Sequence, residues 1–246
     1  MAMARESIER IAGVLQSDPL VKAVWVAGSV ARGDDDEVSD LDLWVESDSW
    51  VPDLRSGLLA AGMHATIGDS PLLHGVDAEG VIVDLRYGPV APPEYRKLPS
   101  FSPVKVAPAP MDPAGFYTDF WINTYKDRKP LYRGLEPLVI FGLGFAKMSL
   151  VRAWVGDDTG VPEPDVSFSI FGLTDVVKKH LTPERVRLLG LPMRDRSEIV
   201  AAVVAYREEM LRLTPAGYRL PEIVMNDPLF RGLIGESSAD AVGKAP

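Results

Sequence analysis

The chain has 246 residues, of which 46% are hydrophobic, and this is enough for one large or two modest domains with a buried core. The absence of cysteine excludes disulfides, thiolate metal sites and a cysteine nucleophile, and only three histidines disfavour a histidine-rich metal site. The net charge of −9 disfavours a long nucleic-acid substrate, because binding to a polyanion depends on clustered lysine and arginine. The same charge is compatible with a cationic small molecule as substrate.

The hydropathy of the chain predicts a cytoplasmic protein. No run approaches the roughly 18 consecutive apolar residues of a membrane span. The first ten residues are too charged for the apolar core of a secretory signal.

The first part of the chain alternates between helical and strand patterns. Ile8, Ile11 and Leu15 recur at helical spacing, whereas apolar runs bounded by glycine and polar residues predict strands. The predicted elements are a helix over residues 4–16, strands over 24–27 and from residue 40, a helix within 47–62, a strand over 63–68, and a hairpin of 72–76 with 81–87.

Prolines are frequent between residues 88 and 113, and they predict an extended connector and a domain boundary, because proline lacks the N–H and fixes φ. Beyond this connector, helical spacing predicts a bundle. We expect Gly134, Pro137, Gly142 and Gly144 to interrupt or loosen the segment 131–156, so that its first part is a loop and its firmest helical part is 145–156. The other predicted helices lie within residues 112–129, 175–181, 182–190 and 194–213.

Two aspartates stand out in the second predicted strand. Asp40 and Asp42 lie two residues apart and therefore share one face, while the leucine that follows each of them points to the other face. Paired carboxylates repel each other unless a cation lies between them, and Mg²⁺ prefers carboxylate oxygens together with substrate phosphates. The pair predicts half of a metal site; the alternative is an acidic surface hairpin that continues the acidic run 34–37.

The residues that follow the first predicted strand suit a phosphate ligand. Gly28 allows the backbone to approach closely, Ser29 offers a hydroxyl and an N–H, and Arg32 offers a planar fork of donors.

A third carboxylate lies inside the predicted strand 81–87. Asp84 faces away from Val83 and Leu85, and a charge in such a strand needs a partner, because burying it uncompensated is costly. Arg86 is one candidate partner; a catalytic site is the other interpretation.

Together, the stretch GSVARG and the stretch SDLD, with Ser29 eleven positions before Asp40, resemble the signature of nucleotidyltransferases of the DNA polymerase beta superfamily. The closest resemblance is to the bacterial lincosamide and aminoglycoside (streptomycin-type) antibiotic nucleotidyltransferases. The resemblance implies an α+β fold: a mixed-sheet nucleotidyltransferase domain over residues 1–110, then a helical substrate-binding domain over 111–235 and a flexible tail over 236–246.

The resemblance also implies roles for particular residues. Asp40, Asp42 and Asp84 would be catalytic and would hold two Mg²⁺ ions, with Asp84 as metal ligand, general base or both. A nucleoside triphosphate, most readily ATP, would be bound by Gly28, Ser29, Arg32 and Lys147. Lys147 has the alternative of a lysine that lies along a half-buried helix. Trp121 and Trp154 have two interpretations, residues that line the cleft or, more commonly for aromatics at helical spacing, residues of the core.

The implied reaction is transfer of a nucleoside monophosphate to a hydroxyl of a small molecule, with release of pyrophosphate. Asp119, Asp127 and Glu136 would suit an amino-sugar antibiotic, although carboxylates of this kind are more often a solvated helix face. The alternatives are a partner protein or a tRNA as acceptor, or a noncatalytic nucleotide-binding module. Whether the apolar helices pack within one chain or across a homodimer is left open.

Overall fold

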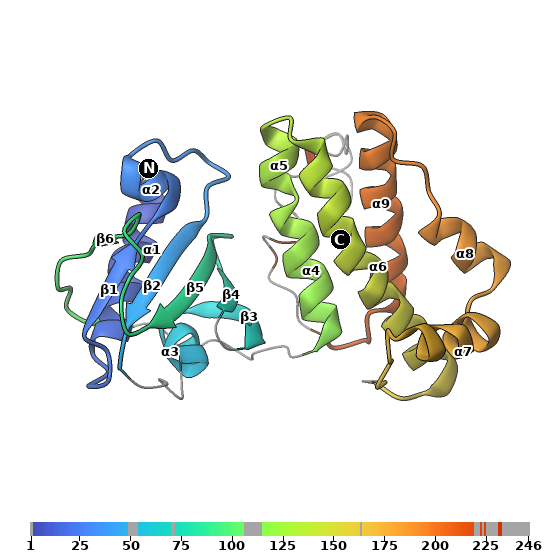
Figure 1. Ribbon diagram of the computed structural model, residues 1–246, viewed down its shortest axis with the longest axis horizontal. Coiled ribbons are helices and arrows are strands. Elements are labelled where there is room, and N and C mark those ends of the chain that lie inside the picture. Colours follow the sequence, from blue (N-terminus) through green and yellow to red (C-terminus); the bar gives the residue numbers. More distant parts are fainter. Residues whose placement is uncertain are drawn as a thin grey trace, which may run out of the picture. The chain divides into compact units, whose positions relative to one another are not determined.

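The computed structural model describes residues 2–48, 54–69, 72–105, 115–162 and 164–218, together with residues 222, 224, 231 and 232. The chain forms two compact units (Figure 1). The first consists of Met1–Ala114 with Arg219–Met225, and the second of Gly115–Tyr218 with Asn226–Pro246. The predicted tail 236–246 lies outside the described residues.

In the described part of the first unit, six strands form one mixed sheet in the order β3-β4-β5-β2-β1-β6 (Figure 1). Neighbouring strands are antiparallel, except that β2 and β5 are parallel. The strands are β1 (Ala23–Val26), β2 (Leu41–Glu46), β3 (Met63–Asp69), β4 (Leu72–Asp77), β5 (Ile82–Gly88) and β6 (Arg96–Lys97).

One face of this sheet carries the core of the first unit. Helices α1 (Ala2–Gln16) and α3 (Leu54–Ala60) pack on it, and the predicted alternation places alternate residues of the strands beneath them. The members of this core include Ile8, Ile11, Leu15, Leu41, Leu43, Val45, Leu58, Val83 and Leu85. The helix over 4–16 and the strands expected around it are therefore confirmed.

Two segments of the first unit differ from the expectation. No helix was predicted between the first two strands, but a short helix, α2 (Gly28–Arg32), follows β1 after the single residue Ala27. Within the described part of the proline-rich connector, residues 88–105, Arg96 and Lys97 pair with β1 as the edge strand β6. Residues 49–53, within the second predicted helix, and residues 106–114, where the third was expected to begin, lie outside the described residues.

The second unit is helical over its described residues, so the expected α+β fold class is confirmed. Helix α6 packs against α4 and α9 (Figure 1). Helices α7, α8 and α9 begin at Ser169, Thr182 and Asp195, whose side chains each accept a hydrogen bond from a backbone N–H of the first turn. The helices are α4 (Phe116–Lys126), α5 (Arg128–Tyr132), α6 (Glu136–Thr159), α7 (Ile170–His180), α8 (Pro183–Leu189) and α9 (Arg196–Leu213).

The interruption expected within residues 131–156 is confirmed at Gly134, which lies between α5 and α6 with φ 67°, and is wrong beyond it, because α6 is one continuous helix of 24 residues. Pro137 lies in its first turn, where the missing N–H has no partner to lose. Gly142 faces Asp127, whose Oδ1 would lie 2.5 Å from a Cβ at that position. This glycine therefore provides room for a neighbouring side chain and does not end the helix.

Helix α6 is the one helix of the described chain that has the length and mean hydropathy, 1.6, of a membrane span. Half of its most apolar window is buried, and its buried side chains include Leu143, Leu150 and Trp154. A core helix has the same composition, so this is weak evidence for a membrane span. Trp121 and Trp154 are 2% and 0% exposed, which confirms that they belong to the core.

Two of the three acidic residues expected on solvated helix faces, Asp127 and Glu136, differ from each other in burial and in partners. Asp127 is buried, with 5% of its surface exposed. Glu136 accepts a 2.6 Å hydrogen bond from Nη1 of Arg196. Burial raises the pKa of Asp127 well above its usual 3.8, and the charge of Arg207 opposes the rise.

Asp127→Asn should make the stability of the protein less dependent on pH. The folded state holds the Asp127 proton more tightly than the unfolded state, so the free energy of unfolding falls as pH rises from about 4 towards the raised pKa. The contribution is at most about 1.4 kcal/mol per pH unit. Asparagine does not titrate, so the variant should gain stability relative to the wild type as pH rises, as urea denaturation between pH 4 and 8 would show.

Asp175→Asn is the matched control, because the side chain of Asp175 on α7 is 70% exposed. This variant should keep the pH dependence of the wild type. Parallel stability curves for the wild type and Asp127→Asn would contradict the prediction.

Candidate functional site

The parallel pairing of β2 and β5 brings two of the three predicted carboxylates together. Asp42 and Asp84 are directly opposite each other in the register of these strands. Both are half-buried and lie on the face away from α1 and α3, because Leu41, Leu43 and Leu85 occupy the core face. Like charges in this position repel each other, so the arrangement favours a cation or a proton nearby.

Asp40 lies two residues before Asp42 and just outside β2, which begins at Leu41. It is half-buried. The strand was expected to begin at Asp40 and begins one residue later, and ends of strands commonly differ by this much.

The backbone of Gly28 approaches the carboxylate of Asp42 closely. The N–H of Ala27 donates a 2.9 Å hydrogen bond to the carbonyl of Asp42, which ties the end of β1 to β2. Gly28 follows with φ 68°, in the left-handed region, and a Cβ there would overlap Oδ2 of Asp42. Both the conformation and the missing side chain are needed at this position. The backbone of Gly28, predicted to approach a ligand closely, therefore lies against the carboxylate of Asp42.

Ser29 and Arg32 lie in α2 and have partners within the first unit. The buried Ser29 donates through Oγ to Oγ of Ser39 at 3.0 Å. Arg32 is exposed and pairs with Asp34, with Nη2 3.1 Å from Oδ1. A phosphate that bound here would compete with Asp34 for the guanidinium.

The partner of Asp84 is a residue that sequence reasoning missed. His74 on β4 is opposite Asp84 in the register of β4 and β5, and its Nδ1 lies 2.6 Å from Oδ1 of Asp84. Asp42, Asp84 and His74 therefore form a cross-strand row over β2, β5 and β4. Alternation within the strand 72–76 is the signal that places His74 on this face, but the pairing depends on register.

The contact with His74 gives Asp84 a partner other than Arg86, the candidate named from the sequence, and Arg86 forms a hydrogen bond with Tyr95. Arg86 lies opposite Trp44 in the register of β2 and β5, and its positive charge acts to lower the pKa of Tyr95. Tyr95, from the connector, packs edge-on against Trp44 with 5.9 Å between ring centres. Burial raises the pKa of Tyr95, Arg86 opposes the rise and Asp42 adds to it. The connector thus contributes a buried aromatic residue beside the cross-strand row.

The donor set can be compared with the metal that the resemblance implies. Over the residues that the structure describes, no group of three or more His, Cys, Asp or Glu side chains is arranged to hold a metal ion. Mg²⁺, however, is usually bound through one or two carboxylates together with substrate phosphates and water. Asp42 and Asp84, as paired hard oxygen donors, fit that mode of binding.

Lys147 belongs to the second unit, on α6. It is half-buried, and its Nζ lies 5.9 Å from the centre of the Tyr206 ring. Burial lowers the pKa of this lysine.

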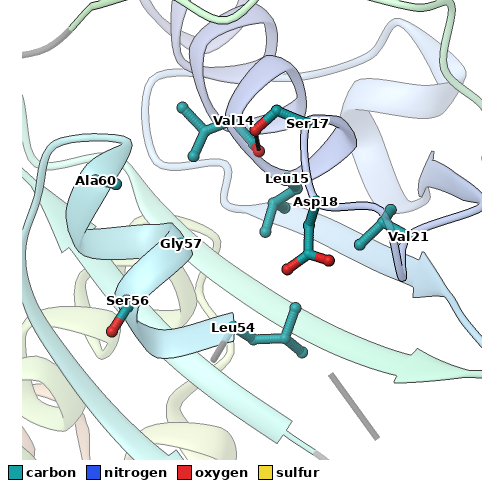
Figure 2. A pocket seen from close by; sticks show the side chains of 9 residues that line it. All are labelled: Val14, Leu15, Ser17, Asp18, Val21, Leu54, Ser56, Gly57 and Ala60. Atoms are coloured by element: carbon teal, nitrogen blue, oxygen red, sulfur yellow. Dashed lines mark hydrogen bonds between the residues drawn. The ribbon is translucent and has the colours of Figure 1, made fainter. Parts of the chain in front are cut away.

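A cavity of about 270 Å³ lies between the end of α1 and α3 (Figure 2). Its lining is mostly apolar, and Asp18 there accepts a hydrogen bond from the N–H of Leu20. None of the predicted site residues lines it. We assign it no catalytic role.

Residues 8–84 match the family described as Nucleotidyltransferase domain. The match begins in α1 and ends at Asp84 in β5, so every predicted site residue except Lys147 lies inside it. The expected nucleotidyltransferase domain is therefore confirmed over these residues.

No curated protein matches the chain. A solved structure to which it is similar is that of the Bradyrhizobium diazoefficiens CD-NTase CdnG in complex with GTP, with 15% sequence identity and a TM-score of 0.24. The similarity covers 86% of this chain and 69% of the other. At this TM-score, the likeness carries no argument about fold or ligand.

Proposed function

We propose that this chain, a nucleotidyltransferase by the domain at residues 8–84, moves a nucleoside monophosphate from a nucleoside triphosphate to a hydroxyl of a small molecule. The donor is ATP and the acceptor an aminoglycoside- or lincosamide-type antibiotic. Pyrophosphate is the second product, and the reaction depends on Mg²⁺.

The observation that carries the proposal is the juxtaposition of Asp42 and Asp84 in the parallel register of β2 and β5, with the backbone of Gly28 against Asp42. The site requires glycine at position 28 for its conformation and for the space that Asp42 occupies. Positioning and charge stabilisation supply most of the rate in transfer reactions at phosphorus, and both are properties of such a site.

The residues of the chain have distinct tasks in the reaction. The α2 region, with Gly28, Ser29 and Arg32, binds the β- and γ-phosphates. The acceptor oxygen forms a bond to the α-phosphorus while the bond from that phosphorus to the oxygen bridging to the β-phosphate breaks. Pyrophosphate leaves with that bridging oxygen, and the proton of the acceptor hydroxyl passes to Asp84.

Asp40, Asp42 and Asp84 are the residues that would hold Mg²⁺. The bound metal supplies Lewis-acid polarisation of the phosphate oxygens and lowers the pKa of the acceptor hydroxyl. For Lys147 we propose a role in neutralising phosphate charge, which the resemblance implies and which a Lys147→Met variant would test through the KM for the triphosphate.

The small-molecule acceptor is supported by charge. A chain with 26 basic and 35 acidic residues is poorly suited to a tRNA, whose binding depends on clustered basic side chains. A cationic acceptor is attracted by such a protein.

The test is pyrophosphate release from each of the four ribonucleoside triphosphates with Mg²⁺, over a panel of aminoglycosides and lincosamides, with mass spectrometry of the products. We expect one class of acceptor to gain the mass of a nucleoside monophosphate, with ATP as donor. Modification of a partner protein or a tRNA instead would overturn the acceptor class, and use of GTP alone would overturn the donor.

A further inference from the structure

We infer that His74 is a positioning residue of the site: its Nδ1–H holds Oδ1 of Asp84 and so fixes the carboxylate that receives the acceptor proton. This inference rests on the proposed function. It goes beyond the predicted three aspartates, because it adds to them a fourth residue, from β4.

The contact has the geometry of a strong hydrogen bond. Nδ1 of His74 and Oδ1 of Asp84 are 2.6 Å apart, within the range of charge-assisted bonds, and a carboxylate oxygen can only accept. With Asp84 ionised, as its role in the proposed reaction requires, the contact requires a proton on Nδ1 of the imidazole. The side chains of His74 and Asp84 are 21% and 14% exposed, so water competes little for this bond.

The backbone holds both residues in place. β4 lies between β3 and β5, so it is hydrogen-bonded on both sides, and His74 and Asp84 are direct partners in the antiparallel register. A carboxylate at the end of a short side chain still rotates about its last bond. The hydrogen bond from His74 removes this rotation and leaves one orientation of Asp84 towards the site.

The orientation of the Asp84 carboxylate depends on its neighbours on both adjacent strands. Asp42 lies directly opposite Asp84 on the other side, and repulsion between the two would turn Asp84 away. His74 lies on β4, on the far side of β5 from Asp42, and it donates to Oδ1, so it holds the Asp84 carboxylate in the orientation that this repulsion also favours. Outer partners that orient carboxylates in this way typically contribute about 10- to 100-fold in activity or metal affinity.

Two substitutions separate positioning from other roles. His74→Leu removes the donor and keeps much of the bulk. His74→Asn places an amide nitrogen near the position of Nδ1 and can still donate to Asp84, but it cannot act as a base. The matched control is His64→Leu on the neighbouring strand β3, where the same change is made at another half-buried histidine of the sheet.

We expect His74→Leu to lower kcat for pyrophosphate release by about 10- to 100-fold. The KM for the triphosphate should change by less than about threefold, because His74 does not contact the triphosphate in the proposed reaction. His74→Asn should recover most of that kcat, and His64→Leu should match the wild type. In an Asp84→Ala background, His74→Leu should have no further effect. Loss of kcat in His74→Asn equal to that in His74→Leu would overturn the inference, as would an undiminished effect in the Asp84→Ala background.

A readout without turnover keeps the inference separate from the proposed function. The ¹⁵N spectrum of the His74 ring in metal-free protein should show a protonated, hydrogen-bonded Nδ1, and Asp84→Ala should shift that signal. An identical Nδ1 signal in the two proteins would overturn the inference even if nucleotidyl transfer is observed. Absence of transfer by the wild type, with the expected Nδ1 signal, would instead count against the proposed function alone.

Discussion

Asp42→Asn should lower nucleotidyl transfer by about 10³-fold or more while the protein remains folded. Asparagine has nearly the same shape as aspartate but lacks the charge that a Mg²⁺-bound triphosphate requires. Asp42 lies opposite Asp84, and Oδ2 of Asp42 occupies the space that a Cβ of residue 28 would need. The Asp42 carboxylate is therefore in close contact with two other parts of the site. Pyrophosphate release under saturating triphosphate measures the loss.

The fold should tolerate this change, because it removes the repulsion between two facing carboxylates. We expect the free energy of unfolding of the metal-free protein to change by less than about 1 kcal/mol. The control is Asp48→Asn, at a residue just beyond the end of β2 whose side chain is 70% exposed and pairs with Lys22. Normal turnover in Asp42→Asn would contradict the site, and so would an equal loss in Asp48→Asn.

Gly28→Ala should reduce both activity and stability. Alanine at φ 68° has the strain of the left-handed region, about 1–2 kcal/mol. Its Cβ also overlaps Oδ2 of Asp42, so either the carboxylate or the start of α2 must move. We expect a total loss of about 2–4 kcal/mol in the free energy of unfolding. A displaced carboxylate should lower kcat by about 10²-fold.

Gly33→Ala isolates the two causes. Gly33 has φ 80° at the other end of α2, but a Cβ there meets nothing within 4 Å. This variant should lose only the backbone term, about 1–2 kcal/mol, and keep its kcat. Equal losses of kcat in the two variants would show that the close approach of Gly28 to Asp42 is irrelevant to the reaction. Urea denaturation and pyrophosphate release would be measured on both proteins.

Local patterns were sufficient to predict most of the fold. Strict alternation in β2 and β5 placed Asp42 and Asp84 on the face away from the core, and helical spacing placed Ile8, Ile11 and Leu15 inside it. These predictions succeed because each depends on a few neighbouring residues.

The features that the sequence did not predict depend on residues far apart in the chain. The bond of His74 to Asp84 depends on how β4 and β5 align, and local alternation does not determine that register. Gly142 was predicted to interrupt a helix, because the reason for a glycine at this position is contact with Asp127, which local sequence does not reveal. The pairing of β6 with β1 joins residues about 70 positions apart, so the prolines of the connector predicted an extended segment but not its pairing with β1.

The alternation in β2 and β5 also acts as a check on correct assembly. A slip of one residue between these strands would turn Asp42 away from Asp84 and, in the same movement, bring core leucines such as Leu43 to the wrong face. No stable misaligned form can therefore keep a half-working site, since the burial that holds the strands together fails with the alignment of the carboxylates. Selection for a correctly folded chain thereby also maintains the geometry of the site.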